Sequence, residues 1–242
     1  MNNEIGILIV TAASLGFVHT ILGPDHYLPF IVMSKARNWS VFRTISITFL
    51  CGLGHVASSV ILGTIGIIFG VALHKLEFFE STRGDWAAWG FLIFGVGYLV
   101  WALWRLYSNK AHKHTHTHGS IVHSHEHDHK HGVLDATKVP HKHSHGHETT
   151  NLTPWLLFLV FVLGPCEPLI PILMYPAAQA STMGVVAVTS VFAITTIVTM
   201  LTVVIAVSYG FKFVKTATLE KYTHVIAGST VALSGVLILV GL

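Results

Sequence analysis

Six side chains that can bind metal ions lie in apolar stretches of this 242-residue sequence. An ionised side chain inside a helix in lipid costs on the order of 3 kcal/mol or more, so such residues usually mark a site or an ion path. Imidazole nitrogens, a thiolate and carboxylate oxygens together suit nickel, cobalt or zinc, whereas calcium and magnesium prefer oxygen ligands alone. The sequence therefore predicts a divalent transition-metal site formed by His19, Asp25, His26, His55, Cys166 and Glu167.

Several of these residues also have plainer explanations. His55 alone would serve as a packing histidine bonded to a carbonyl, and Cys166 as an ordinary buried thiol. Asp25 could orient a ligating histidine as a hydrogen-bond acceptor instead of binding the ion itself. His19 lies seven residues before His26, so the two share a face only if the helix is not badly broken. The sequence leaves these alternatives open.

A repeated Leu-Gly-Pro tripeptide positions four of the six side chains. It occupies residues 22–24, directly before Asp25 and His26, and it returns 141 residues later at 163–165, directly before Cys166 and Glu167. Proline lacks an N–H and clashes with the carbonyl four residues earlier, which breaks a helix. A freed carbonyl in lipid is tolerated only where protein or a hydrated cavity satisfies it. We therefore expect helix breaks at both copies, and both copies facing the interior of a helix bundle.

The composition indicates that these stretches cross a lipid bilayer. Only 10% of the residues are charged and 52% are hydrophobic, whereas soluble domains carry about 25% charge. The net charge of +3 follows membrane topology and indicates no nucleic-acid partner. Both cysteines, Cys51 and Cys166, lie in apolar segments, which argues against a secreted disulfide framework. The first residues lack a basic region, so we expect a retained span and not a cleaved signal peptide.

Six apolar spans are expected, at about residues 5–33, 41–73, 86–107, 154–180, 183–211 and 222–242. Twelve of the 14 lysines and arginines follow the first, third and fifth spans, and only Lys75 and Arg83 lie on the opposite side. Cytoplasmic loops carry an excess of positive charge. The sequence therefore predicts an integral protein of the bacterial cytoplasmic membrane with both termini outside.

Three spans followed by three spans of opposite orientation predict an inverted-topology repeat. The expected fold is an all-α polytopic membrane protein with a 3+3 repeat, in which helices 1 and 4 are broken by Gly-Pro. Gly90 and Gly97 match Gly228 and Gly235 at an offset of 138 residues, and small residues allow close helix packing. Repeats of this kind place a transporter's binding site near the midplane. Chance similarity between apolar segments is the alternative.

A histidine-rich segment separates the two predicted halves. Thirteen of the 18 histidines fall between His112 and His147. Such a segment cannot bury a core, so we expect a disordered cytoplasmic loop that binds metal ions loosely, whether to collect, buffer or sense them. The predicted domains are a first membrane repeat at 1–107, this loop at 108–153, and a second membrane repeat at 154–242.

Two short motifs resemble those of the nickel/cobalt transporters. Residues 49–55 (FLCGLGH) contain a Leu-Gly-His motif, and residues 19–26 (HTILGPDH) resemble a His-x4-Asp-His signature, with five residues intervening here. The layout resembles RcnA-type exporters and UreH-like proteins of the LysE-type transporter group. Residues 165–168 (PCEP) resemble Pro-Cys motifs of UreH-like and CcdA-like proteins. The resemblance implies that His19, Asp25, His26 and His55 are metal ligands or their neighbours.

We predict a membrane transporter of a divalent transition-metal ion, nickel or cobalt first and zinc or iron next. It would not be an enzyme, would hold no prosthetic group, and would need a coupling ion or partner, because no P-loop motif is present. A homo-oligomer is left open. One alternative is a CcdA-like thiol–disulfide electron carrier, although the repeat matches Cys166 with Asp25, and Cys51 with Phe192. The other is a membrane metal sensor or storage protein.

Overall fold

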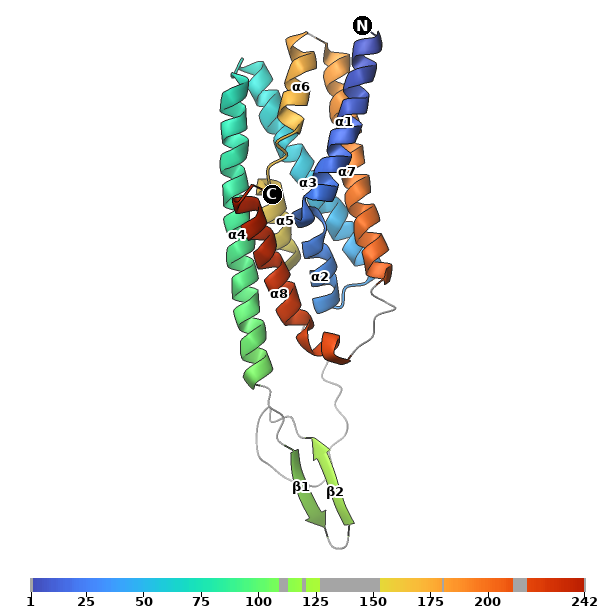
Figure 1. Cartoon of the computed structure of the whole chain (residues 1–242), viewed down its shortest axis with the longest axis vertical. Helices are drawn as coiled ribbons and strands as arrows, with labels where there is room; N and C mark the ends of the chain where they lie inside the picture. The colour runs from blue at the N-terminus through green and yellow to red at the C-terminus, as the bar shows by residue number, and fades with distance from the viewer. Residues whose placement is uncertain are drawn as a thin grey trace. The chain divides into compact units, whose positions relative to one another are not determined.

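A computed structural model of the chain describes residues 2–108, 113–118, 121–126, 153–179, 181–210 and 217–241. They form two compact units, one made of residues 1–102 with 152–242 and the other of residues 103–151. The elements, shown in Figure 1, are α1 (Asn2–Leu22), η1 (Pro24–His26), α2 (Leu28–Ala36), α3 (Val41–Ile68), α4 (Leu73–Ser108), β1 (Lys113–His118), β2 (Ile121–Glu126), α5 (Thr153–Leu163), α6 (Leu169–Ala178), α7 (Thr182–Gly210) and α8 (Ala217–Leu239).

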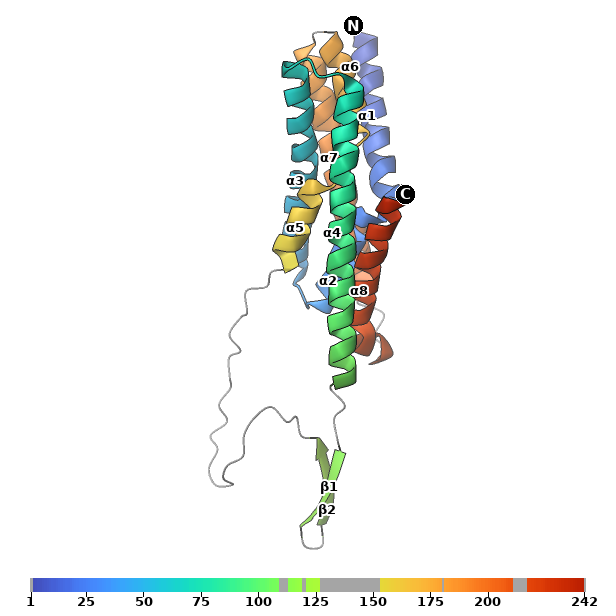
Figure 2. The ribbon, with the colours of Figure 1, turned by 90° about the vertical axis from the view of Figure 1, so that its left-hand side faces the viewer.

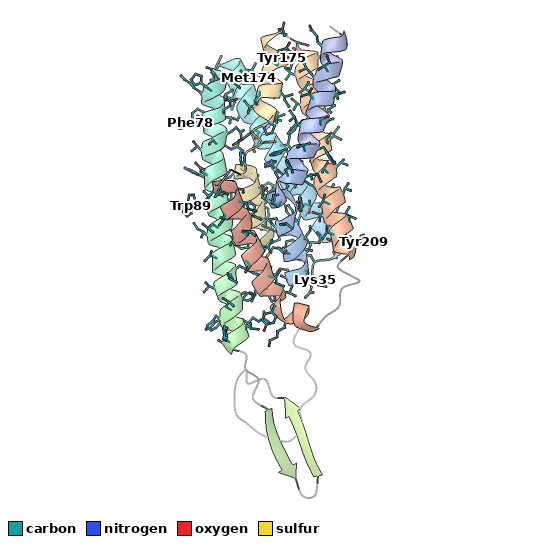
Figure 3. All side chains as sticks on the ribbon, viewed as in Figure 1. Lys35, Phe78, Trp89, Met174, Tyr175 and Tyr209 are labelled. Carbon is teal, nitrogen blue, oxygen red and sulfur yellow. The ribbon has the colours of Figure 1, made fainter. Side chains whose placement is uncertain are left out.

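The helices confirm that this is an integral membrane protein. Within the part of the chain that the structure describes, five segments are long and apolar enough to cross a bilayer: Glu4–Leu22, Val41–Ile68, Leu73–Ser108, Thr182–Gly210 and Lys221–Leu239. Large apolar side chains on the outer surface are widely exposed. In Figure 3, Phe78, Trp89 and Tyr209 point away from the helices, and they are 67%, 54% and 49% exposed. Such a surface is suited to lipid.

The chain leaves the α-helix at both Leu-Gly-Pro copies, as predicted. At the first copy α1 ends at Leu22, a single 3-10 turn covers Pro24–His26, and α2 begins at Leu28. At the second copy α5 ends at Leu163 and α6 begins at Leu169. Proline accounts for both breaks, because its ring excludes the carbonyl four residues earlier from a helical hydrogen bond.

Helix packing places both breaks inside the larger unit. The helix α1 runs along α7, α3 packs between α5 and α7, and α2 lies against α8, an arrangement that can be followed in Figures 1 and 2. Glycines let α4 and α8 approach closely. A Cβ added to Gly228 or Gly235 would overlap backbone atoms of α4, and one added to Gly95 would overlap the backbone of Ala232. Gly97, which the sequence pattern grouped with them, faces open space.

Two features differ from the sequence-based expectation. The helix α4 begins at Leu73 and not near residue 86, so Glu80 and Arg83 belong to a membrane helix and not to a loop. Part of the histidine-rich segment forms a two-stranded antiparallel sheet, with His114 opposite His125. Histidine alternates with threonine or serine there, and this period of two fits a strand. The rest of that segment lies outside the described residues, and the predicted domain boundaries stay a prediction.

The contact between α4 and α8 can be tested with one added methyl group. We expect Gly95→Ala to lower the free energy of unfolding by about 1–3 kcal/mol, because the new Cβ meets the Ala232 backbone. The matched control is Gly97→Ala, which gains the same helix propensity in open space and should be neutral or slightly stabilising. Thermal unfolding in detergent measures the difference, and equal melting temperatures would contradict the packing.

Candidate functional site

Three histidines from three different elements meet beside the first helix break. His19 comes from the end of α1, His26 from η1 and His55 from the middle of α3. One ring nitrogen of each lies within 4.8 Å of those of the other two. The ring centroids of His19 and His26 are 4.6 Å apart, and those of His26 and His55 are 5.1 Å apart. His26 and His55 are each only 2% exposed. The pattern of short motifs thus identified three side chains that the fold brings together.

Hydrogen bonds fix the direction in which two of these rings point. The Nδ1 atom of His26 lies 3.1 Å from the Gly23 carbonyl oxygen and 3.3 Å from a carboxylate oxygen of Asp25. The Nδ1 atom of His55 lies 3.3 Å from the Phe161 carbonyl oxygen. Because these oxygens only accept, each Nδ1 must carry the proton, and each Nε2 of a neutral ring then presents a lone pair. The Nε2 atoms of all three histidines are buried and have no partner among the described residues.

A cavity of 370 Å³ connects the two helix breaks. It is lined on one side by His19, Asp25 and His26 and on the other by Pro165, Glu167 and Pro168. Both Leu-Gly-Pro copies therefore border the same cavity, although Leu22 of the first copy is 72% exposed. Among the six residues singled out in the sequence, His19, Asp25, His26 and His55 are neighbours. Glu167 reaches the same cavity from the second break.

Cys166 lies apart from the histidine cluster. It is fully buried among Ala12, Val56, Leu169 and Phe192, and its backbone N–H donates to a Glu80 carboxylate oxygen at 3.3 Å. No cysteine belongs to a metal-ligand group among the described residues. The other cysteine, Cys51, is buried in a second cluster with Leu157 and Phe161. Both thiols are free.

A buried ion pair supports the second break, and the sequence analysis missed it. The Glu80 side chain is fully buried, and its carboxylate accepts a hydrogen bond from Arg83 at 2.8 Å. Arg83 also donates to the hydroxyl of Ser58 at 2.6 Å and to the carbonyls of Val162 and Gly164 at 2.9 and 3.3 Å. The spacing of three residues between Glu80 and Arg83 was the available signal, since such residues are neighbours on a helix.

Comparison with family models gives a match over most of the chain. A family model described as Cytochrome C biogenesis protein transmembrane region matches residues 27–237. Comparisons with curated proteins and with solved structures gave no match.

The family match corrects the predicted resemblance and the predicted function. The similarity to nickel/cobalt transporters depended on motifs of seven and eight residues, whereas the family model spans residues 27–237 and describes another family. A few histidines and an aspartate at helical spacing occur wherever buried polar groups meet, so motifs this short do not identify a family. The prediction of a membrane transporter for nickel, cobalt, zinc or iron is therefore wrong. The match favours the thiol–disulfide carrier that was the alternative.

The contribution of the ion pair can be measured at Arg83. We expect Arg83→Met to lower the free energy of unfolding by about 3–5 kcal/mol, because Glu80 would remain as a buried carboxylate without its partner. Thr82→Ala is the control, since the exposed Thr82 hydroxyl donates only to the Phe78 carbonyl of its own helix. The double variant Glu80→Gln, Arg83→Met should recover part of the loss. Thermal unfolding in detergent is the measurement, and equal stability of Arg83→Met and Thr82→Ala would contradict the assignment.

Proposed function

We propose that this chain, which belongs to the Cytochrome C biogenesis protein transmembrane region family, carries reducing equivalents across the membrane by thiol–disulfide exchange. The observation that carries the proposal is the family match, whose residues 27–237 include both cysteines of the sequence. Two cysteines are the minimum for a carrier that alternates between a disulfide and two thiols.

Cys166 is the thiol that exchanges with the partner proteins. It directly follows the Gly-Pro break of the second half, and its chain neighbours Pro165 and Glu167 line the 370 Å³ cavity. The Glu80 carboxylate holds its backbone N–H, and Pro165 packs against Gly84 of α4. An unwound turn held on one side by a fixed helix can move its side chain with small changes in backbone dihedrals, which supports an exchanging role.

Cys51 is the resolving thiol, and α3 links it to Cys166. Cys51 lies one helical turn before His55, and Val56 of the same helix packs in the cluster that contains Cys166. The two thiols belong to different buried clusters. Forming a disulfide between them therefore requires α3 to shift against the break between α5 and α6. Such a shift is the conformational step of the proposed cycle.

The cycle conserves electrons and protons. A donor dithiol attacks the disulfide between Cys51 and Cys166, forms a mixed disulfide, and leaves as a disulfide when its second thiol resolves the intermediate. The carrier then holds two thiols. On the other side of the membrane, Cys166 attacks an acceptor disulfide and Cys51 resolves the mixed disulfide. The acceptor leaves with two thiols, so that two electrons and two protons have moved from donor to acceptor.

The finer architecture that we propose is a 3+3 inverted repeat of six spans in the bacterial cytoplasmic membrane. The five long apolar segments would be joined by a sixth span made of α5 and α6. Two similarly placed helix breaks on one cavity support the repeat. The excess of basic residues after the first, third and fifth spans supports termini outside and a cytoplasmic histidine-rich segment.

Electron transfer can be tested in liposomes that contain the full-length protein. A charged phosphine reductant that does not cross membranes is sealed inside, and an aromatic disulfide that absorbs visible light when reduced is added outside. We expect colour to develop faster than in empty liposomes, and Cys51→Ser and Cys166→Ser to return the rate to that background. Thr82→Ser, at a half-buried position of α4, serves as the control. Background rates for the unmutated protein, or full rates for Cys166→Ser, would overturn the proposal.

The proposed topology predicts which turns are accessible from each side. Lys35→Cys in α2 and Ala72→Cys before α4 introduce exposed thiols at opposite ends of the helices. In intact cells without an outer membrane, an impermeant maleimide should label Ala72→Cys and not Lys35→Cys, and lysis should expose both. Labelling of Lys35→Cys in intact cells would refute the orientation.

A further inference from the structure

We propose that the Nε2 atoms of His19, His26 and His55 bind one transition-metal ion that resides permanently in the helix bundle. The proposal concerns a resident ion and goes beyond thiol–disulfide exchange. It depends on the position of the three rings and on the hydrogen bonds that orient them.

The three rings are already close to the arrangement that an ion requires. Zinc–nitrogen bonds of about 2.0–2.1 Å place the nitrogens of a tetrahedral site about 3.3–3.4 Å apart. The ring nitrogens of His19, His26 and His55 lie within 4.8 Å of one another. Binding one ion requires the three nitrogens to move closer together than they lie here.

The Nδ1 atoms of His26 and His55 make the kind of hydrogen bond that is found in known metal sites. A metal-ligating histidine usually donates its second N–H to a carbonyl or a carboxylate, which fixes the ring and its tautomer. His26 meets this condition with the Gly23 carbonyl and the Asp25 carboxylate, and His55 meets it with the Phe161 carbonyl. Both carbonyls lie at the helix breaks. The breaks thus hold two imidazoles by Nδ1 and leave their Nε2 atoms without a partner among the described residues.

The Nε2 atoms of the three histidines have no hydrogen-bond partner within the described part of the protein. All three of these atoms are buried. An unsatisfied buried polar atom is destabilising, and three such atoms in one cluster add to this cost. A bound cation would convert all three lone pairs into ligand bonds.

The donor set indicates the class of ion. Three neutral imidazoles suit zinc, copper, nickel or cobalt and do not suit magnesium or calcium, which require oxygen ligands. His19 and His26 line the cavity, so one coordination position remains open toward it. Asp25 lies 3.3 Å from His26, and its carboxylate supplies negative charge beside the ion. Glu167 lines the same cavity.

The site would connect parts of the chain that the breaks separate. Its ligands belong to α1, η1 and α3, and His55 reaches α5 through the Phe161 carbonyl. An ion held by all three imidazoles therefore joins both sides of the first break to α3 and, through it, to the start of the second break.

Cobalt(II) is the probe, because its visible absorption reports coordination by nitrogen in a tetrahedral site. The test uses the full-length protein in detergent with the thirteen histidines between His112 and His147 replaced by serine, since those imidazoles bind the same ion. We expect one equivalent of cobalt to bind with intense visible bands. His26→Ala and His55→Ala should each lower the affinity at least about tenfold, because even partners outside the first ligand shell contribute 10–100-fold.

The control is His74→Ala, an exposed histidine at the start of α4 that is not in the cluster. X-ray absorption of the cobalt protein with an intact cluster should show three imidazole ligands, and this measurement does not depend on whether the alanine variants fold. Fewer than three imidazoles, or equal affinity in His26→Ala and His74→Ala, would overturn the proposal. Neither readout involves Cys51 or Cys166, so its failure is distinct from failure of the proposed electron transfer.

Discussion

Two helix breaks in an apolar bundle free backbone carbonyls that only the protein can satisfy. At the first break, the Gly23 carbonyl accepts the backbone N–H of His26 at 3.0 Å and the His26 ring at 3.1 Å. At the second break, the Phe161 carbonyl accepts the N–H of Gly164 and faces the His55 ring. Since an unsatisfied carbonyl in lipid costs several kcal/mol, each break requires donors nearby. The buried rings of His26 and His55 are found where these carbonyls are.

This requirement also explains why a buried ion pair is retained. Arg83 has several donors in a planar group, so it can bond to Val162, Gly164 and Ser58 while it stays paired with Glu80. Glu80 neutralises the arginine and uses its second oxygen to hold the backbone N–H of Cys166. A buried ion pair is weak evidence for stability by itself. Here each member also completes hydrogen bonds that the break left open.

The sequence could predict the features that follow from local chemistry. The breaks at Pro24 and Pro165 follow from a ring clash within one turn, and the apolar segments follow from composition. The proximity of His19, His26 and His55 depends on which helices pack together. The short motifs indicated this proximity only through the spacing of the residues in the sequence. The role of Arg83 could not be predicted, because the extent of α4 was underestimated and its partners at Val162 and Gly164 are 79 and 81 residues away. The family assignment failed because two short motifs cannot replace agreement along residues 27–237.

Both breaks leave backbone carbonyls without a helical hydrogen bond. Different groups satisfy these carbonyls at each break. The first break is satisfied largely from within, because His26 bonds to Gly23 three residues away. The second depends on α3 and α4, through His55 and Arg83. A self-contained turn keeps its polar side chains at the cavity, whereas a turn held by a neighbouring helix can bury Cys166 completely. The repeated tripeptide therefore ends a helix at the same position in both halves, while the hydrogen-bond partners around each copy differ.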